Sequence, residues 1–513
     1  MSLHSSRRYI ESFNYIYTPS SPSYPNLRQS FQQNPRWLNS TSSRPEFIVT
    51  PYSEAEIRAA VICCKKYDLQ IRVKSGGHDY EGLSFLCQVP FIIIDLTNLR
   101  SISVDLEDET AWVDSGATVG ELYYTIAKNS DVLGFPAGIC PSVGIGGHFS
   151  GGGIGTMLRK HGLAADNIID AYFIDVDGRI LDREAMGEDL FWAIRGGGGA
   201  SFGIVVAWKI KLVRVPPVVT VFTLHKNLDQ ECIQLVNIWQ NVSSKLPREL
   251  FIRLVFQNSN RDDNGDQGMV EVLFNSLFLG PVKELIPLME KSFPELGLDS
   301  KDCSEMSWIE STLYLQGFKS GDPLEVLLDR TVQDKSYFKA KSDFVEEPIP
   351  EYVWEALRGR ISEERIGILI LDPLGGRMDE IPESELPFPH RKGNLYNIQY
   401  LVKWTVDGAD ESERHVNWIR SLYDYMEPYV ARSPRSAYLN YRDLDIGINK
   451  PGDVDYSQAA VWGSRYFKGN FEMLAEVKSR IDPGNFFTSE QSIPPLNHPG
   501  KNQLEHNSLR FDI

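Results

Sequence analysis

Two glycine-rich loops in the first third of the chain constrain its fold most, because each carries a reactive side chain. The first reads Arg-Val-Lys-Ser-Gly-Gly-His-Asp-Tyr over residues 72–80 and contains His78. The second covers residues 140–153, begins with Cys140 and contains six glycines. Backbone amides without a Cβ approach phosphate closely, and consecutive amides form anion-binding concavities. One such run is more often an ordinary turn. Two runs that each carry a nucleophile predict a large phosphate-bearing cofactor, and we expect a flavin.

Other cofactor and metal sites are disfavoured by the spacing of the motifs. Neither loop, nor a third glycine run at 196–199, opens a helix directly after the first strand of a βαβ unit, and none reads as GxxxxGK[ST]. A doubly wound nucleotide fold is therefore not expected. The six cysteines form neither a disulfide-dense framework nor a zinc spacing, so no metal is expected.

Length and charge limit the class of protein further. A chain of 513 residues exceeds what one hydrophobic core usually serves, so two or more domains are expected. A net charge of −17 argues against binding to nucleic acid or to anionic membranes. The polar start, with Arg7 and Arg8 followed by no apolar run, shows no signal peptide. A cytosolic protein and a sequence that has lost its leader both remain open, and the sequons at Asn39 and Asn241 are compatible with secretion.

Patterns along the chain divide it into five parts. Residues 1–45 are a polar lead-in with one short helix. Residues 46–217 alternate short strands and helices, with a capping box at Ser53 and Glu56, and end at Pro216-Pro217. Residues 218–460 carry longer strands with helices between them, which predicts an antiparallel sheet covered by helices on one face. Residues 461–490 form a helical segment that returns to the first domain, and residues 491–513 are expected to be disordered.

Several segments together resemble one family. They are Arg72 to Ser84, Phe135 to Gly155, Gly162 to Asp170, Met186 to Gly203, Asn394 to Tyr400, Tyr438 to Asp443 and Asp482 to Phe487. In these segments the chain is similar to the plant berberine bridge enzyme-like proteins, within the vanillyl-alcohol oxidase / p-cresol methylhydroxylase class of flavoproteins. The resemblance implies an α+β fold. A two-part FAD-binding domain of the vanillyl-alcohol oxidase type would be joined to a substrate domain with an antiparallel sheet covered by helices.

The resemblance also implies how FAD is held. His78 would bind the 8α-methyl carbon of the flavin and Cys140 its C6 carbon, and imidazole and thiolate are nucleophiles suited to an electron-poor ring. The alternatives are a loop histidine that makes hydrogen bonds and a buried thiol. The other cofactor-binding residues implied are Ser75, Gly76, Gly77, Val143, Gly144, Gly146, Gly147, His148, Gly151, Gly152, Gly203 and Ile204.

The candidate catalytic residues by resemblance are Tyr441 and Gln399, on strands of the second region. A phenol with an ordinary pKa of about 10 needs a neighbour that favours the phenolate before it can act as a base. Arg442 would face the other way in a strand. The expected substrate pocket consists of Tyr80, Ile154, Asn397 and Tyr400. Relatives that oxidise phenolic alcohols tend to have lysine in place of Asn397 and often tyrosine in place of Ile154, so we expect a larger apolar substrate.

The function implied is an FAD-dependent oxidase of a plant secondary metabolite, with hydride transfer to flavin N5, O2 as acceptor, H2O2 as product, and ring closure as one outcome. Val143 matches the residue type that leaves room for O2. Two alternatives stay open: a flavin-bearing scaffold for a non-redox reaction such as a cycloaddition, favoured by Asn397 and Ile154, and an inactive flavin carrier. We expect a monomer in the secretory pathway, vacuole or extracellular space. Relatives usually form a disulfide between an N-terminal cysteine and the cysteine that corresponds to Cys63. This sequence has no cysteine before Cys63.

Overall fold

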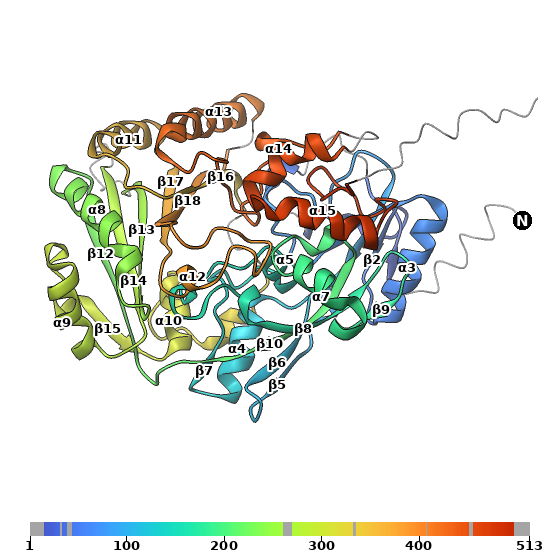
Figure 1. The fold of residues 1–513 in the computed structure, drawn as a ribbon, viewed down its shortest axis with the longest axis horizontal. Coiled ribbons are helices and arrows are strands. Elements are labelled where there is room, and N and C mark those ends of the chain that lie inside the picture. The colour runs from blue at the N-terminus through green and yellow to red at the C-terminus, as the bar shows by residue number, and fades with distance from the viewer. Residues whose placement is uncertain are drawn as a thin grey trace, which may run out of the picture.

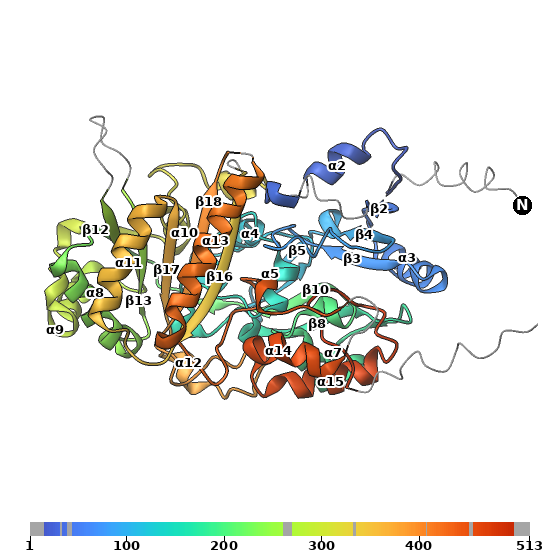
Figure 2. The ribbon, with the colours of Figure 1, turned by 90° about the horizontal axis from the view of Figure 1, so that it is seen from above.

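The computed structural model describes residues 15–30, 33–37, 44–259, 269–331, 335–406, 408–450 and 455–496. A large sheet and its helices occupy one side of the molecule, and the smaller sheets of the first half of the chain occupy the other (Figures 1 and 2). The C-terminal helices α14 (Tyr456–Phe467) and α15 (Asn470–Ile481) return to the side of the first half. Their residues Trp462 and Leu474 share one hydrophobic core with Phe149 and Trp208 of that half.

The first sheet positions the first glycine loop. In order across the sheet, its strands are β1 (Ile16–Tyr17), β2 (Phe47–Val49), β4 (Phe91–Asp95) and β3 (Gln70–Lys74). β2, β4 and β3 run parallel, so β2 and β3 need a crossover, which α3 (Glu54–Tyr67) provides. The predicted capping box of Ser53 and Glu56 begins this helix. The first glycine loop follows directly where β3 ends.

An antiparallel sheet positions the second glycine loop. Its strands, in order, are β5 (Ile102–Asp105), β6 (Thr110–Asp114), β10 (Ile204–Lys211), β8 (Ile168–Ile174) and β9 (Ile180–Leu181). β7 (Leu133–Gly134) and β11 (Val213–Arg214) form a separate pair. The helices of this half are α4 (Val119–Asn129), α5 (Ile145–Ser150), α6 (Leu158–His161) and α7 (Arg183–Ile194). The short helix α5 begins inside the second glycine loop, which is thereby held against this sheet.

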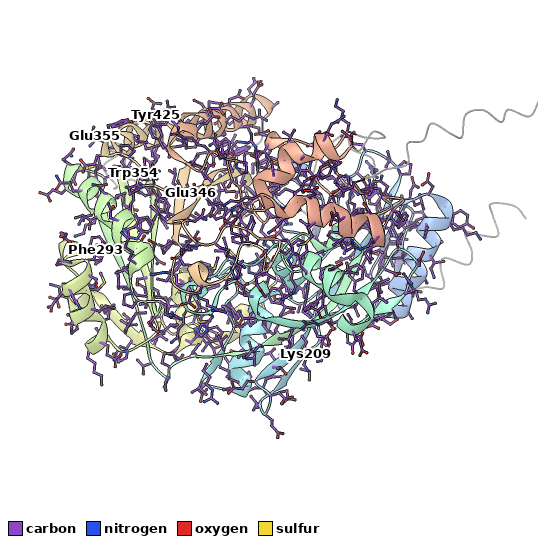
Figure 3. All side chains as sticks on the ribbon, in the orientation of Figure 1. Lys209, Phe293, Glu346, Trp354, Glu355 and Tyr425 are labelled. Atoms are coloured by element: carbon purple, nitrogen blue, oxygen red, sulfur yellow. The ribbon has the colours of Figure 1, made fainter. Side chains whose placement is uncertain are left out.

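The large sheet is antiparallel throughout. Its strands, in order, are β15 (Cys303–Met306), β12 (Val219–Asn227), β14 (Val270–Phe278), β13 (Leu250–Asn258), β17 (Gly367–Pro373), β18 (Tyr396–Trp404) and β16 (Tyr337–Val345). Four helices share a core with one of its faces: α8 (Gln230–Val242), α9 (Val282–Ser292), α11 (Glu351–Glu364) and α13 (Ala409–Met426). On α11, buried Trp354 stacks on Phe256 with ring centroids 5.3 Å apart, whereas the next residue, Glu355, is exposed (Figure 3). The predicted α+β fold, with helices over one face of an antiparallel sheet, is confirmed.

A buried arginine joins the two halves. The guanidinium of Arg159, on α6, donates to the backbone carbonyls of Leu250 at 2.6 Å, Leu246 at 2.6 Å, Leu374 at 3.0 Å and Ser244 at 3.1 Å. Burial lowers the pKa of Arg159 to about 10. Because all four acceptors belong to the half with the large sheet, this side chain fixes the position of that sheet relative to the second glycine loop.

The chain ends differ from expectation in two places. The lead-in has the short helix that was predicted, α2 (Tyr24–Ser30), but it also adds strand β1 to the first sheet. We predicted that the chain is disordered from residue 491 onward. This prediction is wrong for the first residues of that segment, because Gln491, Ser492 and Ile493 are buried. Residues 497–513 and the sequon at Asn39 lie outside the described residues. Within the described residues, no helix is both long enough and apolar enough to cross a membrane.

Candidate functional site

A cavity of about 450 Å³ is enclosed by both halves of the molecule and by the C-terminal segment. The first half contributes the two glycine loops and residues 197–201. The large sheet contributes Arg253, Ile370 and Gln399 from three neighbouring strands. Residues 438–442 complete the wall together with Thr488, Ser489, Gln491 and Ile493. The cavity therefore lies where the predicted cofactor half meets the predicted substrate half.

The two glycine loops touch backbone to backbone at the cavity wall. A Cβ placed on Gly144 would lie 2.2 Å from the amide nitrogen of Gly76, and one placed on Gly76 would lie 2.3 Å from the amide nitrogen of Gly144. No larger residue fits either position, and this contact brings the two loops together. Gly147 is different, since a Cβ there would meet no atom within 4 Å although the residue lines the cavity. Its glycine is thus not required by the protein's own packing, which fits a ligand that approaches the backbone at this point.

His78 lies in this wall as a neutral imidazole. Burial lowers the pKa of His78 to about 4, with a hydrogen bond to the backbone of Ser142 opposing and Lys74 adding to the shift. Its Nε2 is buried and has no hydrogen-bond partner among the described residues. An uncharged imidazole in the cavity wall fits the residue type needed to bond a flavin methyl carbon.

Cys140 lies in the same wall as a free thiol. The residue is exposed at the cavity surface, yet the protein packed around it desolvates its sulfur. Burial raises the pKa of the Cys140 thiol, and the cations that oppose this shift are Lys403 and Arg253. His78, Cys140 and the open face at Gly147 together fit a flavin. Among the described residues, no group of three or more His, Cys, Asp or Glu side chains could hold a metal ion.

Most of the predicted cofactor residues line this cavity. Those that do are His78, Cys140, Ser75, Gly76, Gly77, Val143, Gly144, Gly146, Gly147, His148, Gly151 and Gly203. His148 accepts a hydrogen bond from the Gly138 amide at 2.8 Å through Nε2, and burial lowers the pKa of His148 to about 4. Gly152 and Ile204 are not in the wall; Ile204 packs into the core of the first sheet instead.

Tyr80 and Tyr441 form a stacked pair in the cavity wall. Their ring centroids are 5.9 Å apart and the planes differ by 5°. Gln399 donates from Nε2 to the Tyr80 hydroxyl at 2.8 Å. Burial holds the pKa of Tyr441 well above its usual range, with Asp372 and Tyr80 adding to the shift and Arg253 opposing it. The prediction that Tyr441 and Arg442 lie in a strand is wrong, because both residues lie in a loop.

A cation in the cavity was missed by the sequence analysis. Arg253 lies in the wall and donates to Asp372 from Nε at 2.5 Å and from Nη2 at 2.9 Å. Burial opposes the charge on Arg253, but Asp372 outweighs it and raises the pKa, with Tyr441 contributing. An arginine inside the apolar run Leu-Phe-Ile-Arg-Leu-Val-Phe was the signal that could have revealed it. Relatives that oxidise phenolic alcohols tend to have a lysine where this chain has Asn397. In this chain the positive charge in the cavity comes from Arg253.

Of the predicted pocket residues, Tyr80 and Ile154 line the cavity, but Asn397 and Tyr400 do not. Asn397 is buried and donates from its amide to the Asp343 carbonyl at 3.0 Å. Tyr400 is in the core under the helices, edge-on to Tyr423 at 5.9 Å. Side chains alternate along a strand, so Tyr400 faces away from the cavity that Gln399 lines.

A second tyrosine of the C-terminal loop also went unnoticed. The Tyr438 hydroxyl accepts hydrogen bonds from the backbone amides of Gly153 at 3.0 Å and Ile154 at 3.1 Å, and from the Asn440 amide at 2.9 Å. Tyr438 and Asn440 both line the cavity. Their contacts attach the C-terminal loop to the end of the second glycine loop, and the conspicuous Tyr-Leu-Asn-Tyr-Arg-Asp segment was the signal for them.

Comparisons with known sequences agree with this arrangement. A family profile described as "FAD binding domain" matches residues 45–183, and one described as "Berberine and berberine like" matches residues 437–494. The chain is 56% identical to berberine bridge enzyme-like 22 of Arabidopsis thaliana over 90% of this chain and 86% of that protein. It is 50% identical to the tetrahydroberberine oxidase of Berberis wilsoniae (94% and 91%). It is 52% identical to a monolignol oxidoreductase of Arabidopsis thaliana (90% and 86%).

Solved structures give the same result. The structure of BBE-like 28 from Arabidopsis thaliana superposes with a TM-score of 0.91 at 48% identity, covering 94% of this chain and 98% of that chain. The grass pollen allergen Phl p 4, described as having glucose dehydrogenase activity, superposes with a TM-score of 0.89 at 45% identity, covering 94% and 97%. Variants of that allergen with isoleucine replaced by valine are described as glucose oxidases.

Proposed function

The chain belongs to the berberine bridge enzyme-like family of FAD-dependent oxidoreductases, and from its site we propose that it oxidises a small plant metabolite at a C–H bond next to a heteroatom. The observation that carries the proposal is the shared cavity. It is lined by His78, Cys140 and Tyr80 from the first half, by Arg253 from the large sheet and by Tyr441 from the C-terminal loop. Bound FAD supplies the acceptor for a hydride at N5, with O2 as the final oxidant and H2O2 as the product.

The protein's own part in this reaction is to hold the substrate and take its proton. Oxidation next to a hydroxyl, or next to an amine that carries a hydrogen, removes a hydride from carbon and a proton from the heteroatom; next to a tertiary amine it removes the hydride alone and leaves an iminium ion. Tyr441 is the proposed proton acceptor, and Arg253 is the charge that favours its phenolate. Tyr80, held by Gln399, provides a flat surface beside Tyr441. Together these groups suit an aromatic or extended apolar substrate with one ionisable group.

Val143 supports the proposal that O2 is the acceptor. It lines the cavity five residues before His148, just before α5 begins. One Phl p 4 variant described as a glucose oxidase carries a new valine and a new histidine at two positions that are spaced as Val143 and His148 are here. The wild-type allergen is described as a dehydrogenase. A valine at this point therefore favours reaction with O2 in this chain.

We further propose that FAD is attached through both His78 and Cys140. Each attachment joins a ring carbon or methyl carbon of the flavin to the side chain and removes two hydrogens, which O2 takes up as H2O2. Denatured wild-type protein should therefore keep its colour and the mass of FAD. His78→Ala and Cys140→Ala should each keep one bond, and the double variant should release all flavin on acid precipitation. Colour that leaves the denatured wild-type protein would show that no bond exists.

The function itself is tested by anaerobic mixing. Tetrahydroberberine, a monolignol and glucose, the substrate classes named for its relatives, are each added without O2, and the visible absorbance of the flavin is followed. Bleaching by one of them, followed by H2O2 formation in air, is the expected result. A substrate that gives product without bleaching would instead support the non-redox scaffold.

We also propose that the protein enters the secretory pathway. Grass pollen allergens among its relatives support this, as does the exposed sequon residue Asn241 on α8. A peptide map of protein expressed in plant cells should find a glycan on Asn241. Recovery of unglycosylated protein from the cytosol would contradict the proposal.

A further inference from the structure

Three consecutive residues after His78 face three consecutive residues of the C-terminal loop. Asp79 accepts a hydrogen bond from Arg442 Nε at 2.8 Å. Tyr80 stacks on Tyr441. The third pair, Glu81 and Asp443, consists of two buried carboxylates that cannot bond to each other directly. We call these three pairs the ladder; it joins the first glycine loop to the loop that carries Tyr441.

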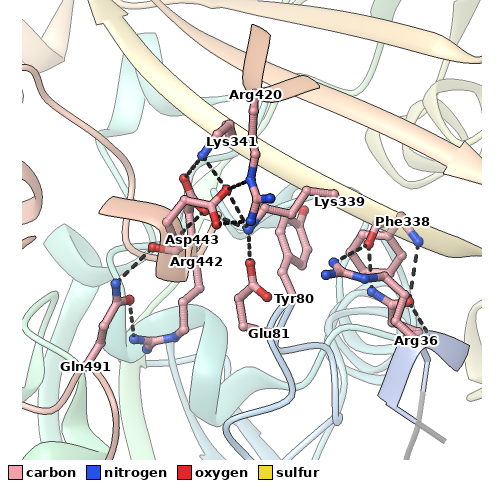
Figure 4. Close-up of polar contacts among 12 residues, drawn as sticks. Arg36, Tyr80, Glu81, Phe338, Lys339, Lys341, Arg420, Arg442, Asp443 and Gln491 are labelled. Carbon is pink, nitrogen blue, oxygen red and sulfur yellow. Dashed lines mark hydrogen bonds and ion pairs between the residues drawn. The ribbon is translucent and has the colours of Figure 1, made fainter. Parts of the chain in front are cut away.

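Lys339 on β16 connects the third pair of the ladder. Its ammonium donates to Glu81 and to Asp443, the latter at 2.7 Å, and the three side chains are each only 3% exposed (Figure 4). The preceding residue, Phe338, meets the Tyr80 ring edge-on with centroids 5.2 Å apart. One end of β16 thus contacts the ladder at Tyr80, Glu81 and Asp443 together.

The charges explain why the ladder depends on this lysine. Burial lowers the pKa of Lys339, but Glu81 and Asp443 outweigh it, so the net shift is upward and the ammonium stays charged. Burial raises the pKa of Glu81, and Lys339 and Arg36 oppose that shift. Without the ammonium, Asp443 would keep Lys341 as a partner, but the buried Glu81 carboxylate would lose the cation that it bonds to, and it would move away from Asp443 or take up a proton. Either response moves the residues next to Tyr80 or Tyr441.

We propose that Lys339 is a positioning residue that sets the spacing and the parallel alignment of Tyr80 and Tyr441. The inference rests on the proposed oxidation at this tyrosine pair. The hydrogen bonds of Lys339 go to the neighbouring carboxylates and, among the described residues, to neither tyrosine, so it acts through those carboxylates. It also belongs to the large sheet, whereas Glu81 belongs to the first half and Asp443 to the C-terminal loop. The tyrosine pair is therefore aligned by a side chain from a third part of the chain.

The chain offers a matched control two residues along the same strand. Lys341 donates to Asp443 at 2.5 Å and to Asp445 at 3.0 Å, and its side chain is also 3% exposed (Figure 4). Arg420 holds Asp445 from the other side, at 2.6 Å. Lys341 thus matches Lys339 in charge, burial and strand face, but no contact joins it to Glu81 among the described residues.

The experiment compares Lys339→Met, Lys339→Arg and Lys341→Met in the flavin-loaded protein. Tyrosines quench flavin emission by electron transfer, which falls steeply with distance, so the fluorescence lifetime of the bound flavin reports the position of the pair without any substrate. Because a thioether at flavin C6 would itself quench the emission, all lifetimes are measured in the Cys140→Ala background, in which FAD stays attached through His78. The rate of anaerobic flavin reduction is measured beside it with the substrate that bleaches the wild-type protein. Lys339→Met should change the lifetime and slow reduction roughly 10- to 100-fold, as expected for a small displacement, without raising the substrate Kd to match. Lys339→Arg keeps the positive charge, so its lifetime and its reduction rate should both stay close to the wild-type values.

Lys341→Met should lose stability without changing the lifetime. If Lys339→Met does not fold, the double variant Lys339→Met/Glu81→Gln removes one buried cation with one buried anion, and it should fold but keep the altered lifetime. An unchanged lifetime in Lys339→Met or the double variant would overturn the proposal. So would an equal change in Lys341→Met, which would indicate general loosening. If no substrate bleaches the wild-type flavin, the proposed oxidation fails, while the lifetimes still decide the role of Lys339.

Discussion

Opposite changes to the Arg253–Asp372 pair should move the pH dependence of oxidation in opposite directions. Asp372 helps burial to hold the pKa of Tyr441 high, and Arg253 opposes it. Arg253→Met removes the lowering influence, whereas Asp372→Asn removes a raising one. A phenol that must lose its proton before it can accept another gives a rate that rises with pH up to its pKa. The rising limb should therefore move to higher pH in Arg253→Met and to lower pH in Asp372→Asn.

The geometry of the pair also sets what each change costs in stability. The two hydrogen bonds measure 2.5 and 2.9 Å, and the Asp372 side chain is 2% exposed. Arg253→Met leaves that carboxylate buried without its cation, which should cost about 3–5 kcal/mol of unfolding free energy. Asp372→Asn keeps a hydrogen-bond acceptor and should cost about 1–3 kcal/mol. On the rising limb, a displacement of one pH unit changes the rate about tenfold at fixed pH.

The assay is the rate of anaerobic flavin bleaching by the substrate found in the screen, measured from neutral to alkaline pH, with urea unfolding of the same samples. The double variant Arg253→Met/Asp372→Leu serves as control, because replacing both partners with apolar groups should recover most of the stability. The assignment of Tyr441 as the proton acceptor tuned by Arg253 would be refuted by either of two results. The rising limb of the pH–rate profile could move in the same direction in both single variants, or it could stay in place in both.

Four further changes test the packing of the site and its reaction with O2. Gly147→Ala should fold like the wild type but lose flavin, read as the visible absorbance of the purified protein, because its Cβ enters only the cavity. Gly144→Ala should instead yield little folded protein, since its Cβ would lie 2.2 Å from the Gly76 nitrogen. Arg159→Met should lower the unfolding free energy by about 3–5 kcal/mol in urea, because it leaves four buried carbonyls without their charged donor. Val143→Ile should slow O2 uptake at an oxygen electrode while anaerobic reduction keeps its rate.

Sequence predicted the parts of the site that depend on local signals. The capping box at Ser53 begins α3, and the two glycine loops meet in one wall. Both features depend on short runs of neighbouring residues, so the sequence alone predicts them. His78 and Cys140 were found for the same reason, since each stands beside its own loop. Covalent attachment at these two residues stays a prediction.

The remaining parts depend on which strands become neighbours. Gln399 and Tyr400 are consecutive in β18, so alternation allows only one of them to face the cavity, and the pattern alone does not say which. Arg253 reaches Tyr441 only because β13 lies in the middle of the large sheet, at the cavity. Lys339 meets Glu81 across 258 positions of sequence, and no local pattern predicts such a contact.

The wall formed by residues 488–493 has a consequence for the order of events in the cell. Arg72, at the base of the first glycine loop, donates to the Thr488 carbonyl at 2.7 Å across 416 positions. Domains fold as they leave the ribosome, and the first glycine loop emerges long before its partner is made. The pocket therefore acquires this wall only after residue 493 has been synthesised, more than 400 residues after the first glycine loop. A chain that stops before residue 488 lacks the side of the cavity that Arg72 holds in place through Thr488.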